Sequence, residues 1–211
     1  MKKRTHLKKI YLALVSIIAF LSVNIESSNP LKVLILGDSI SAGYGIPLKN
    51  QWITILQDDF NSKQKNIKLI NASVSGETTI GGKSRVQKLL KDHKPNYILI
   101  ELGGNDGLRG YPVNKIKDNL IKICDIALKQ DVNVGLMQIR LPPNYGKRYV
   151  QSFENIYKDI SKIKEIILIP FMLNTIALET DLMQEDGIHP NIQAQKLISE
   201  KMAISINYLM Q

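Results

Sequence analysis

Short apolar runs alternate with longer segments of helical periodicity along most of this chain. The apolar runs predict five strands, at residues 32–36, 68–71, 97–102, 132–138 and 166–169. The segments between them predict helices at residues 48–61, 84–92, 113–130 and 149–164, and a last helix from Asn191 to the C-terminus. Strands that alternate with helices favour an α/β fold, in which a parallel sheet is covered on both faces.

Polar clusters follow four of the predicted strands. They lie at residues 38–39, 73–78, 103–106 and 140–145. Right-handed crossovers place the carboxyl ends of parallel strands at one edge of a sheet, and ligands of open α/β sheets bind at that edge. We therefore expect these four clusters to meet in space.

The N-terminus has the pattern of an export signal. A basic cluster precedes an apolar run from Ile10 to Val23, which is short for a membrane span but suits a signal-peptide core. We expect residues 1–28 to be a signal peptide and the protein to be periplasmic or secreted. No A-x-A cleavage pattern occurs, so an uncleaved membrane anchor stays open as an alternative. Residues 29–211 have the length of a single domain.

Charge and cysteine content narrow the function classes. The formal charge of +9 falls to +5 over residues 29–211, because five basic residues and one acidic residue lie before them. A mildly basic surface without runs of like charge argues against nucleic-acid binding, while weak attraction to an anionic membrane surface stays open. The single cysteine, Cys124, lies in an apolar-periodic segment and is expected in the core. No metal-ligand spacing occurs.

Ser39 is the candidate nucleophile, because it stands at the carboxyl end of the first predicted strand. A serine hydroxyl needs a base, most often histidine. His6 lies in the predicted signal segment and His93 in a charged helix end, which leaves His189. Asp186 precedes His189 by three residues, so its carboxylate can reach the imidazole Nδ1–H and orient the ring. The alternative is a helix-capping aspartate beside an incidental histidine.

An acyl-transfer site must also stabilise an oxyanion. Gly76 can offer its backbone N–H without interference from a Cβ, and Asn105 can offer a neutral side-chain N–H. The backbone N–H of Ser39 would be a third donor. Taken singly, Gly76 and Asn105 could equally be ordinary turn residues.

These residues lie in motifs that resemble those of a known family. Gly37-Asp38-Ser39-Ile40, Ser75-Gly76-Glu77-Thr78, Gly103-Gly104-Asn105-Asp106 and Asp186-Gly187-Ile188-His189-Pro190 resemble, in order, the blocks of the SGNH (GDSL-type) hydrolases. The stretches at residues 101–110 and 137–146 resemble the bacterial periplasmic thioesterase/protease/lysophospholipase subgroup.

The resemblance implies a flavodoxin-like three-layer α/β/α sandwich with neither metal nor cofactor. It implies Ser39, Asp186 and His189 as the catalytic residues, and Ser39, Gly76 and Asn105 as the oxyanion hole. It also implies a loop near residues 107–113 that closes over an acyl chain. The residues expected to bind substrate are Leu108, Arg109, Tyr111, Pro112, Leu141 and Tyr145.

The predicted function is therefore hydrolysis of small-molecule acyl esters, thioesters or lysophospholipids through an acyl-enzyme, by a protein that we expect to be monomeric. Two alternatives remain at this point. One is a carbohydrate O-acetyl esterase, which would prefer acetyl groups. The other is a non-catalytic ligand-binding domain on a flavodoxin-like scaffold.

Overall fold

Five parallel strands form the centre of the structure, a computed structural model that describes residues 29–211. The predicted signal segment, residues 1–28, lies outside the described residues. The strands are β1 (Leu31–Gly37), β2 (Ile67–Asn71), β3 (Tyr97–Glu101), β4 (Asn133–Met137) and β5 (Ile167–Ile169). They pair in the order β2-β1-β3-β4-β5, and every pair is parallel.

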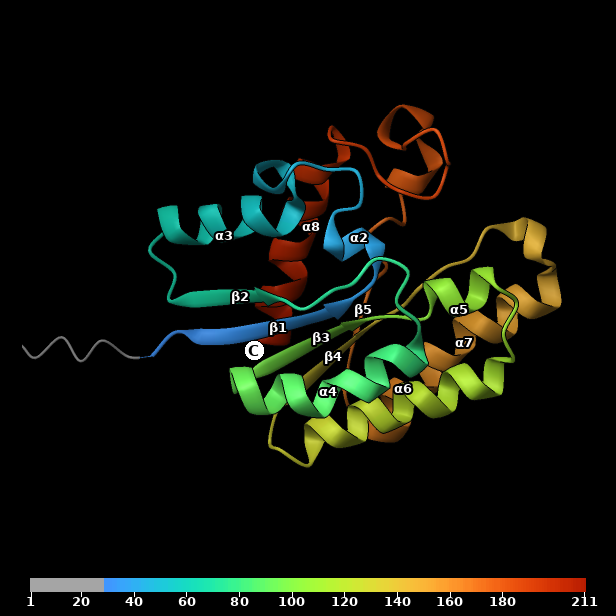
Figure 1. The fold of residues 1–211 in the computed structure, drawn as a ribbon, viewed down its shortest axis with the longest axis horizontal. Coiled ribbons are helices and arrows are strands. Elements are labelled where there is room, and N and C mark those ends of the chain that lie inside the picture. The colour runs from blue at the N-terminus through green and yellow to red at the C-terminus, as the bar shows by residue number, and fades with distance from the viewer. Residues whose placement is uncertain (1–28) are drawn as a thin grey trace, which may run out of the picture.

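Helices cover both faces of this sheet. Figure 1 shows α3 (Trp52–Ser62) and α8 (Ala194–Leu209) on one face. The other face is covered by α4 (Thr79–His93), α6 (Val113–Leu128) and α7 (Lys147–Lys164). The expected α/β/α sandwich with five parallel strands is thereby confirmed.

The strand order creates a crevice beside β1. The chain leaves β1 through α3 on one face and reaches β3 through α4 on the other, so the direction of winding reverses between β1 and β3. Such a switch point leaves an opening outside the carboxyl ends of the two strands. Two short helices lie there, α2 (Ser39–Ala42) directly after β1 and α5 (Gly104–Leu108) after β3.

The core is built from the strands and the inner faces of the helices. Val33, Leu34, Ile35 and Leu36 of β1 are fully buried, which accounts for the unbroken apolar run in the sequence. Each such side chain contributes about 1.5–3 kcal/mol through burial. Cys124 is also fully buried, as expected from its apolar segment.

Helix α4 begins earlier than its apolar pattern predicts, at Thr79 instead of residue 84. The glycines at its start conceal the helix, because glycine is a poor helix former. Gly82 is needed there, since a Cβ on it would lie 2.3 Å from the Leu102 side chain that follows β3. The start of the helix is held by two hydrogen bonds to the Asp106 carboxylate. The backbone N–H of Thr79 donates at 2.9 Å, and its hydroxyl donates at 2.6 Å.

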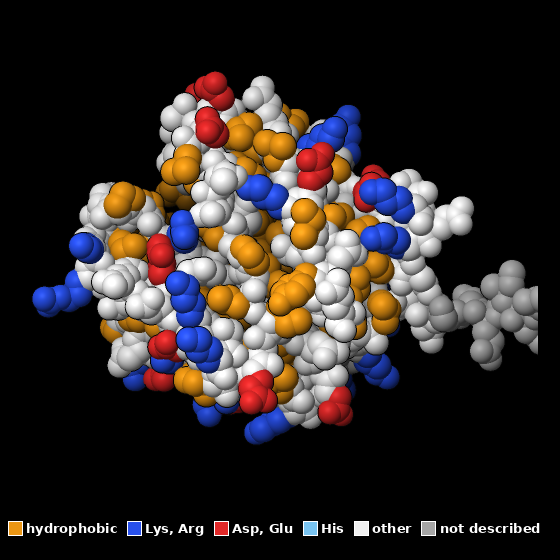
Figure 2. All heavy atoms as spheres, turned by 180° about the vertical axis from the view of Figure 1, so that it is seen from behind, with side chains coloured by type: hydrophobic (Ala, Val, Ile, Leu, Met, Phe, Trp, Pro, Cys, Tyr) orange, Lys and Arg blue, Asp and Glu red, His pale blue; other side chains and the backbone are white. Residues whose placement is uncertain are grey.

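The surface carries scattered charge. On the face in Figure 2, Lys and Arg side chains are interspersed with acidic and apolar ones. Within residues 29–211, no cluster of three or more His, Cys, Asp or Glu side chains could hold a metal ion. No helix in this described part has the length and apolar character needed to cross a membrane.

Candidate active site

Ser39 is positioned by the turn from β1 into α2. Asp38 caps α2, because its Oδ1 accepts the backbone N–H of Ile40 at 3.0 Å. Gly37 lets the strand end pass close to β3, since a Cβ there would lie 2.5 Å from Oε2 of Glu101. Ser39 therefore stands at the first position of the helix, at the switch point of the sheet.

His189 and Asp186 reach this serine from the loop before α8. The Nε2 atom of His189 lies 2.8 Å from Oγ of Ser39, and Nδ1 lies 2.6 Å from Oδ2 of Asp186. The structure thus brings together three side chains that the sequence separates by up to 150 positions. In this arrangement His189 Nε2 can accept the proton of the Ser39 hydroxyl, and the Asp186 carboxylate can hold the imidazole ring in that orientation.

Asp186 is held as a carboxylate. Its Oδ1 accepts the backbone N–H groups of Ile188 and His189, both at 2.9 Å. Partial burial acts to raise the pKa of Asp186, but these hydrogen bonds and the imidazole outweigh it and lower the pKa to about 2. The capping alternative does not apply, because α8 begins only at Ala194.

Of the expected oxyanion donors, Asn105 lines the same cavity as Ser39. Asn105 lies in the first turn of α5, and its Nδ2 donates to Oδ2 of Asp38 at 3.2 Å. Gly76 adopts a φ of 77°, a left-handed conformation that favours glycine. Within residues 29–211, the backbone N–H groups of Ser39 and Gly76 have no protein acceptor.

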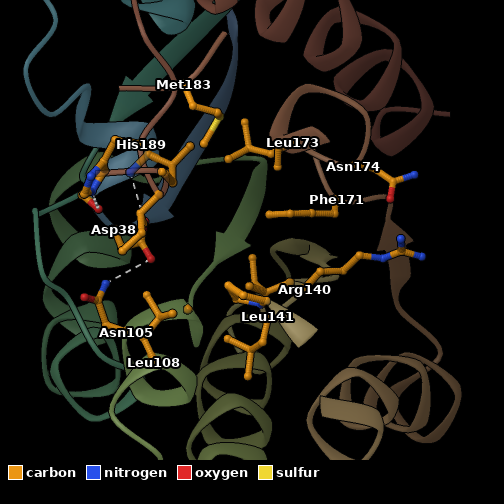
Figure 3. A pocket seen from close by; sticks show the side chains of 18 of the residues that line it. Asp38, Asn105, Leu108, Arg140, Leu141, Phe171, Leu173, Asn174, Met183 and His189 are labelled. Atoms are coloured by element: carbon orange, nitrogen blue, oxygen red, sulfur yellow. Dashed lines mark hydrogen bonds between the residues drawn. The ribbon is translucent and has the colours of Figure 1, made fainter. Parts of the chain in front are cut away.

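A cavity of about 620 Å³ opens beside Ser39. Two of the expected substrate-binding residues, Leu108 and Leu141, line it. Phe171 and Leu173 follow β5 and line another part of the wall, with Leu173 across the pocket from Leu108 (Figure 3). Most of the lining is apolar, whereas Arg140 and Asn174 lie at the end away from His189 (Figure 3).

Four other expected substrate-binding residues do not line this cavity. Arg109 donates to the carbonyl of Gly76 at 3.4 Å instead. Tyr111 and Pro112 belong to the turn that leads into α6, where the Tyr149 hydroxyl donates to the Tyr111 carbonyl at 2.7 Å. Tyr145 lines a separate, shallow hollow beside the start of α7.

Sequence reasoning missed the wall formed after β5. Phe171, Leu173, Leu178 and Met183 contribute to it, and Ile139 extends the opposite side. The signal was present, because the apolar run continues past the last predicted strand and on to the edge where the polar clusters gather.

A doubly covered parallel sheet that carries a serine, a histidine and an aspartate in contact at its switch point defines an SGNH-type serine hydrolase. Comparison with known proteins agrees. The chain belongs to the GDSL-like Lipase/Acylhydrolase family, whose model matches residues 35–197.

Several relatives match most of the chain. An arylesterase of Vibrio mimicus is 41% identical over 90% of this chain and 95% of its own length. Thioesterase 1/protease 1/lysophospholipase L1 of Escherichia coli K12 is 43% identical over 81% of each chain. The crystal structure of esterase EstA from Pseudoalteromonas sp., inhibited by monoethylphosphonate, superposes with a TM-score of 0.84 at 43% identity, covering 85% of this chain and 98% of EstA. The protein is accordingly an esterase, as the sequence predicts.

Proposed function

We propose that the esterase reaction proceeds through an acyl-enzyme on Ser39. The observation that carries the proposal is the continuous contact from the Asp186 carboxylate through His189 to Ser39 Oγ, at 2.6 and 2.8 Å. Because Asp186 accepts Nδ1–H, Nε2 is free to accept the serine proton. The hydroxyl then attacks the carbonyl carbon of the ester.

The two half-reactions use the same groups. His189 takes the proton of Ser39 during attack and gives it to the departing alcohol or thiol, which leaves the acyl group on Ser39 Oγ. A water molecule then attacks the acyl-enzyme while His189 acts again as base, and the acid is released with Ser39 restored. Asp186 keeps the imidazole oriented and stabilises its protonated form.

The oxyanion of each tetrahedral intermediate would be bound by the N–H groups of Ser39 and Gly76 and by the amide of Asn105. The first two have no protein acceptor within residues 29–211, so they are free to donate to substrate. Removal of one donor from such a site lowers kcat about 10²–10³-fold.

The substrate we propose carries an acyl chain longer than acetyl. Leu108, Leu141, Phe171 and Leu173 line a cavity of about 620 Å³, far larger than an acetyl group requires. The names of the relatives, arylesterase and thioesterase/lysophospholipase, support aryl esters, acyl thioesters and lysophospholipids as substrates. An acetyl-specific carbohydrate esterase is the alternative that the cavity disfavours.

We further propose that this reaction takes place outside the cytoplasm. The basic and apolar N-terminal segment supports residues 1–28 as an export signal. Residues 29–211 have the length of a single domain, which we propose to be a monomeric catalytic domain. A weak contact between the mildly basic domain and an anionic membrane surface remains part of the proposal. Mass spectrometry of the exported protein tests the cleavage, because an intact Met1 would contradict it.

Ser39→Ala tests the catalytic assignment. Hydrolysis of a chromogenic octanoyl ester should be lost while the thermal unfolding temperature is unchanged, and a fluorophosphonate probe should label the wild type only. Undiminished turnover by Ser39→Ala would falsify the assignment. The wild type should cleave C8 and longer chains faster than acetyl, and a strict acetyl preference would favour the carbohydrate esterase.

A further inference from the structure

Two buried acids lie beneath Ser39, and the mechanism above uses neither of them. Asp38 is 4% exposed at the end of β1, and Glu101 is 1% exposed at the end of β3. The two strands are neighbours, and Glu101 pairs in register with Gly37. Both acids border the cavity. A buried carboxyl pair is costly, so its presence beside a nucleophile calls for a role.

The two carboxylate oxygens of Asp38 contact different parts of the site: one caps the helix that carries Ser39, and the other contacts Asn105. The Oδ1 atom of Asp38 caps α2 through the N–H of Ile40, at 3.0 Å. Its Oδ2 accepts one N–H of the Asn105 amide at 3.2 Å, the contact drawn as a dashed line in Figure 3. An ionised carboxylate can only accept hydrogen bonds. It therefore requires the nitrogen of Asn105, rather than its oxygen, to face this part of the site.

We propose that Asp38 is a positioning residue for the oxyanion hole, acting through Asn105, and that Glu101 keeps Asp38 ionised. The proposal rests on the proposed function, because it takes Asn105 as an oxyanion donor. The Asn105 amide nitrogen has two N–H groups. One is taken by Asp38, and the other is left to donate to the oxyanion. If the amide turned over, its oxygen would face the developing negative charge and repel it.

Glu101 can keep Asp38 ionised because the two neighbouring carboxyls hold one proton between them. Its Oε2 accepts the Ser41 hydroxyl at 2.8 Å and the Asp38 N–H at 3.3 Å, which places the Glu101 carboxyl beside Asp38. Two adjacent buried carboxyls do not both ionise. Burial and the neighbouring Asp38 raise the pKa of Glu101 well above its usual range, so the proton stays on Glu101.

Asp38 then carries the negative charge of the pair. Burial raises its pKa to about 6, while the N–H of Ile40, the Glu101 carboxyl, His189 and Asn105 act in the opposite direction. The Tyr157 hydroxyl and the Asp106 carboxylate also face this region, but both have other hydrogen-bond partners. The Tyr157 hydroxyl donates to the Leu102 carbonyl, and the Asp106 carboxylate accepts from the backbone N–H and the hydroxyl of Thr79. Asp38 is therefore ionised near neutral pH.

Asp38→Asn is the decisive variant. Asparagine caps a helix as well as aspartate does, so α2 and Ser39 keep their positions. The new amide donates toward Asn105, which must then turn its oxygen to accept. We expect kcat to fall about 10²-fold or more at unchanged KM, as for loss of one oxyanion donor. A fall in kcat of less than about tenfold would overturn the proposal, because that is well below the cost of one such donor.

A double-mutant cycle tests whether Asp38 acts through Asn105. Asn105→Ala is measured first, and Asp38→Asn is then added to it. If Asp38 only positions the Asn105 amide, the second change lowers kcat no further. A full multiplicative loss in the double variant would overturn the proposal. If Asn105→Ala alone leaves kcat unchanged, Asn105 is no oxyanion donor, and both this proposal and that part of the proposed function fail.

Glu101 is tested by a matched pair. Gln reproduces the neutral, hydrogen-bonding state of the protonated carboxyl, so Glu101→Gln should retain kcat, whereas Glu101→Leu should lose it. Ser41→Ala removes a hydrogen bond from Glu101 without touching Asp38, and serves as the control for loss of stability. The proposal fails for Glu101 if Gln and Leu lower kcat equally, or if Ser41→Ala lowers kcat as much as Glu101→Leu.

Discussion

The ring of Tyr44 lies against the imidazole of His189, with ring centroids 4.6 Å apart and planes tilted by 39°. Gln184 connects the two loops that carry these rings. Its side-chain amide donates to the Tyr44 carbonyl at 2.9 Å, and its backbone N–H donates to the His189 carbonyl at 2.7 Å. The imidazole is therefore restrained on its face by Tyr44 as well as at Nδ1 by Asp186.

This contact predicts a role for the Tyr44 ring in catalysis. Aromatic pairs contribute about 0.5–1.5 kcal/mol, and loss of that much orienting energy corresponds to about a two- to tenfold fall in rate. We expect Tyr44→Ala to lower kcat by this factor on a chromogenic ester. Tyr44→Phe keeps the ring and should retain kcat. Equal activity of the Ala and Phe variants would show that the stacking does not restrain His189.

The sheet was predictable because its strands are buried on both faces. Such strands read as unbroken apolar runs, and all five predicted runs coincide with strands to within about two residues, the usual uncertainty of strand ends. The short helices α2 and α5 were not predicted, because four or five residues carry no helical period. Local capping and the neighbouring strands determine them instead.

The polar part of the site was more predictable than its apolar part. Ser39, Asn105, Asp186 and His189 stand out because each follows a strand or a turn in a recognisable motif. The cavity wall has no such motif. The apolar run past β5 marks Phe171 and Leu173 as apolar, but it does not distinguish residues that line a cavity from core residues until the chain is folded. Asp38 and Glu101 were likewise hidden, because their interaction depends on the pairing of β1 with β3.

The cavity predicts a dependence on acyl-chain length. Phe171→Ala removes apolar surface from the cavity wall, so kcat/KM should fall for C8 and C10 esters and change little for acetyl. Tyr145→Ala should show no change that depends on chain length, because Tyr145 lies outside the cavity. The measurement is kcat/KM over a series of 4-nitrophenyl esters.

Ile204→Ala provides a control for this series. Ile204 is exposed on α8 and does not line the cavity. Its variant should follow the wild-type profile at every chain length. A parallel loss on acetyl and octanoyl esters by Phe171→Ala would mean that the residue supports the fold rather than the acyl chain.

The buried thiol predicts resistance to modification. Burial raises the pKa of Cys124 to about 12, with the adjacent Asp125 acting in the same direction, and the side chain is fully buried. Thiolate is the reactive form, so the native protein should react with a thiol reagent only as fast as it unfolds. Reaction followed by absorbance with and without denaturant checks this. Rapid native labelling would contradict the burial of Cys124.

The raised pKa of Glu101 predicts how stability varies with pH. The folded state binds a proton at Glu101 that the unfolded chain releases above its ordinary pKa near 4.5. Stability is therefore greatest below that value and falls as pH rises toward the folded-state pKa, because unfolding releases the proton. Glu101→Gln removes this titration. We expect the unfolding temperature of the wild type to fall more between about pH 5 and pH 8 than that of the variant.

Asp92→Asn separates this effect from general carboxylate titration. Asp92 lies on the surface, and its hydrogen bond to Lys88 lowers its pKa, so it is already ionised in both states across this range. A group with a depressed pKa contributes stability that is lost only in acid. The Asp92→Asn variant should therefore keep the wild-type slope of unfolding temperature against pH. If Glu101→Gln shows the same slope as the wild type and Asp92→Asn, Glu101 is ionised in the folded protein. Glu101 could then not be the neutral neighbour that keeps Asp38 ionised.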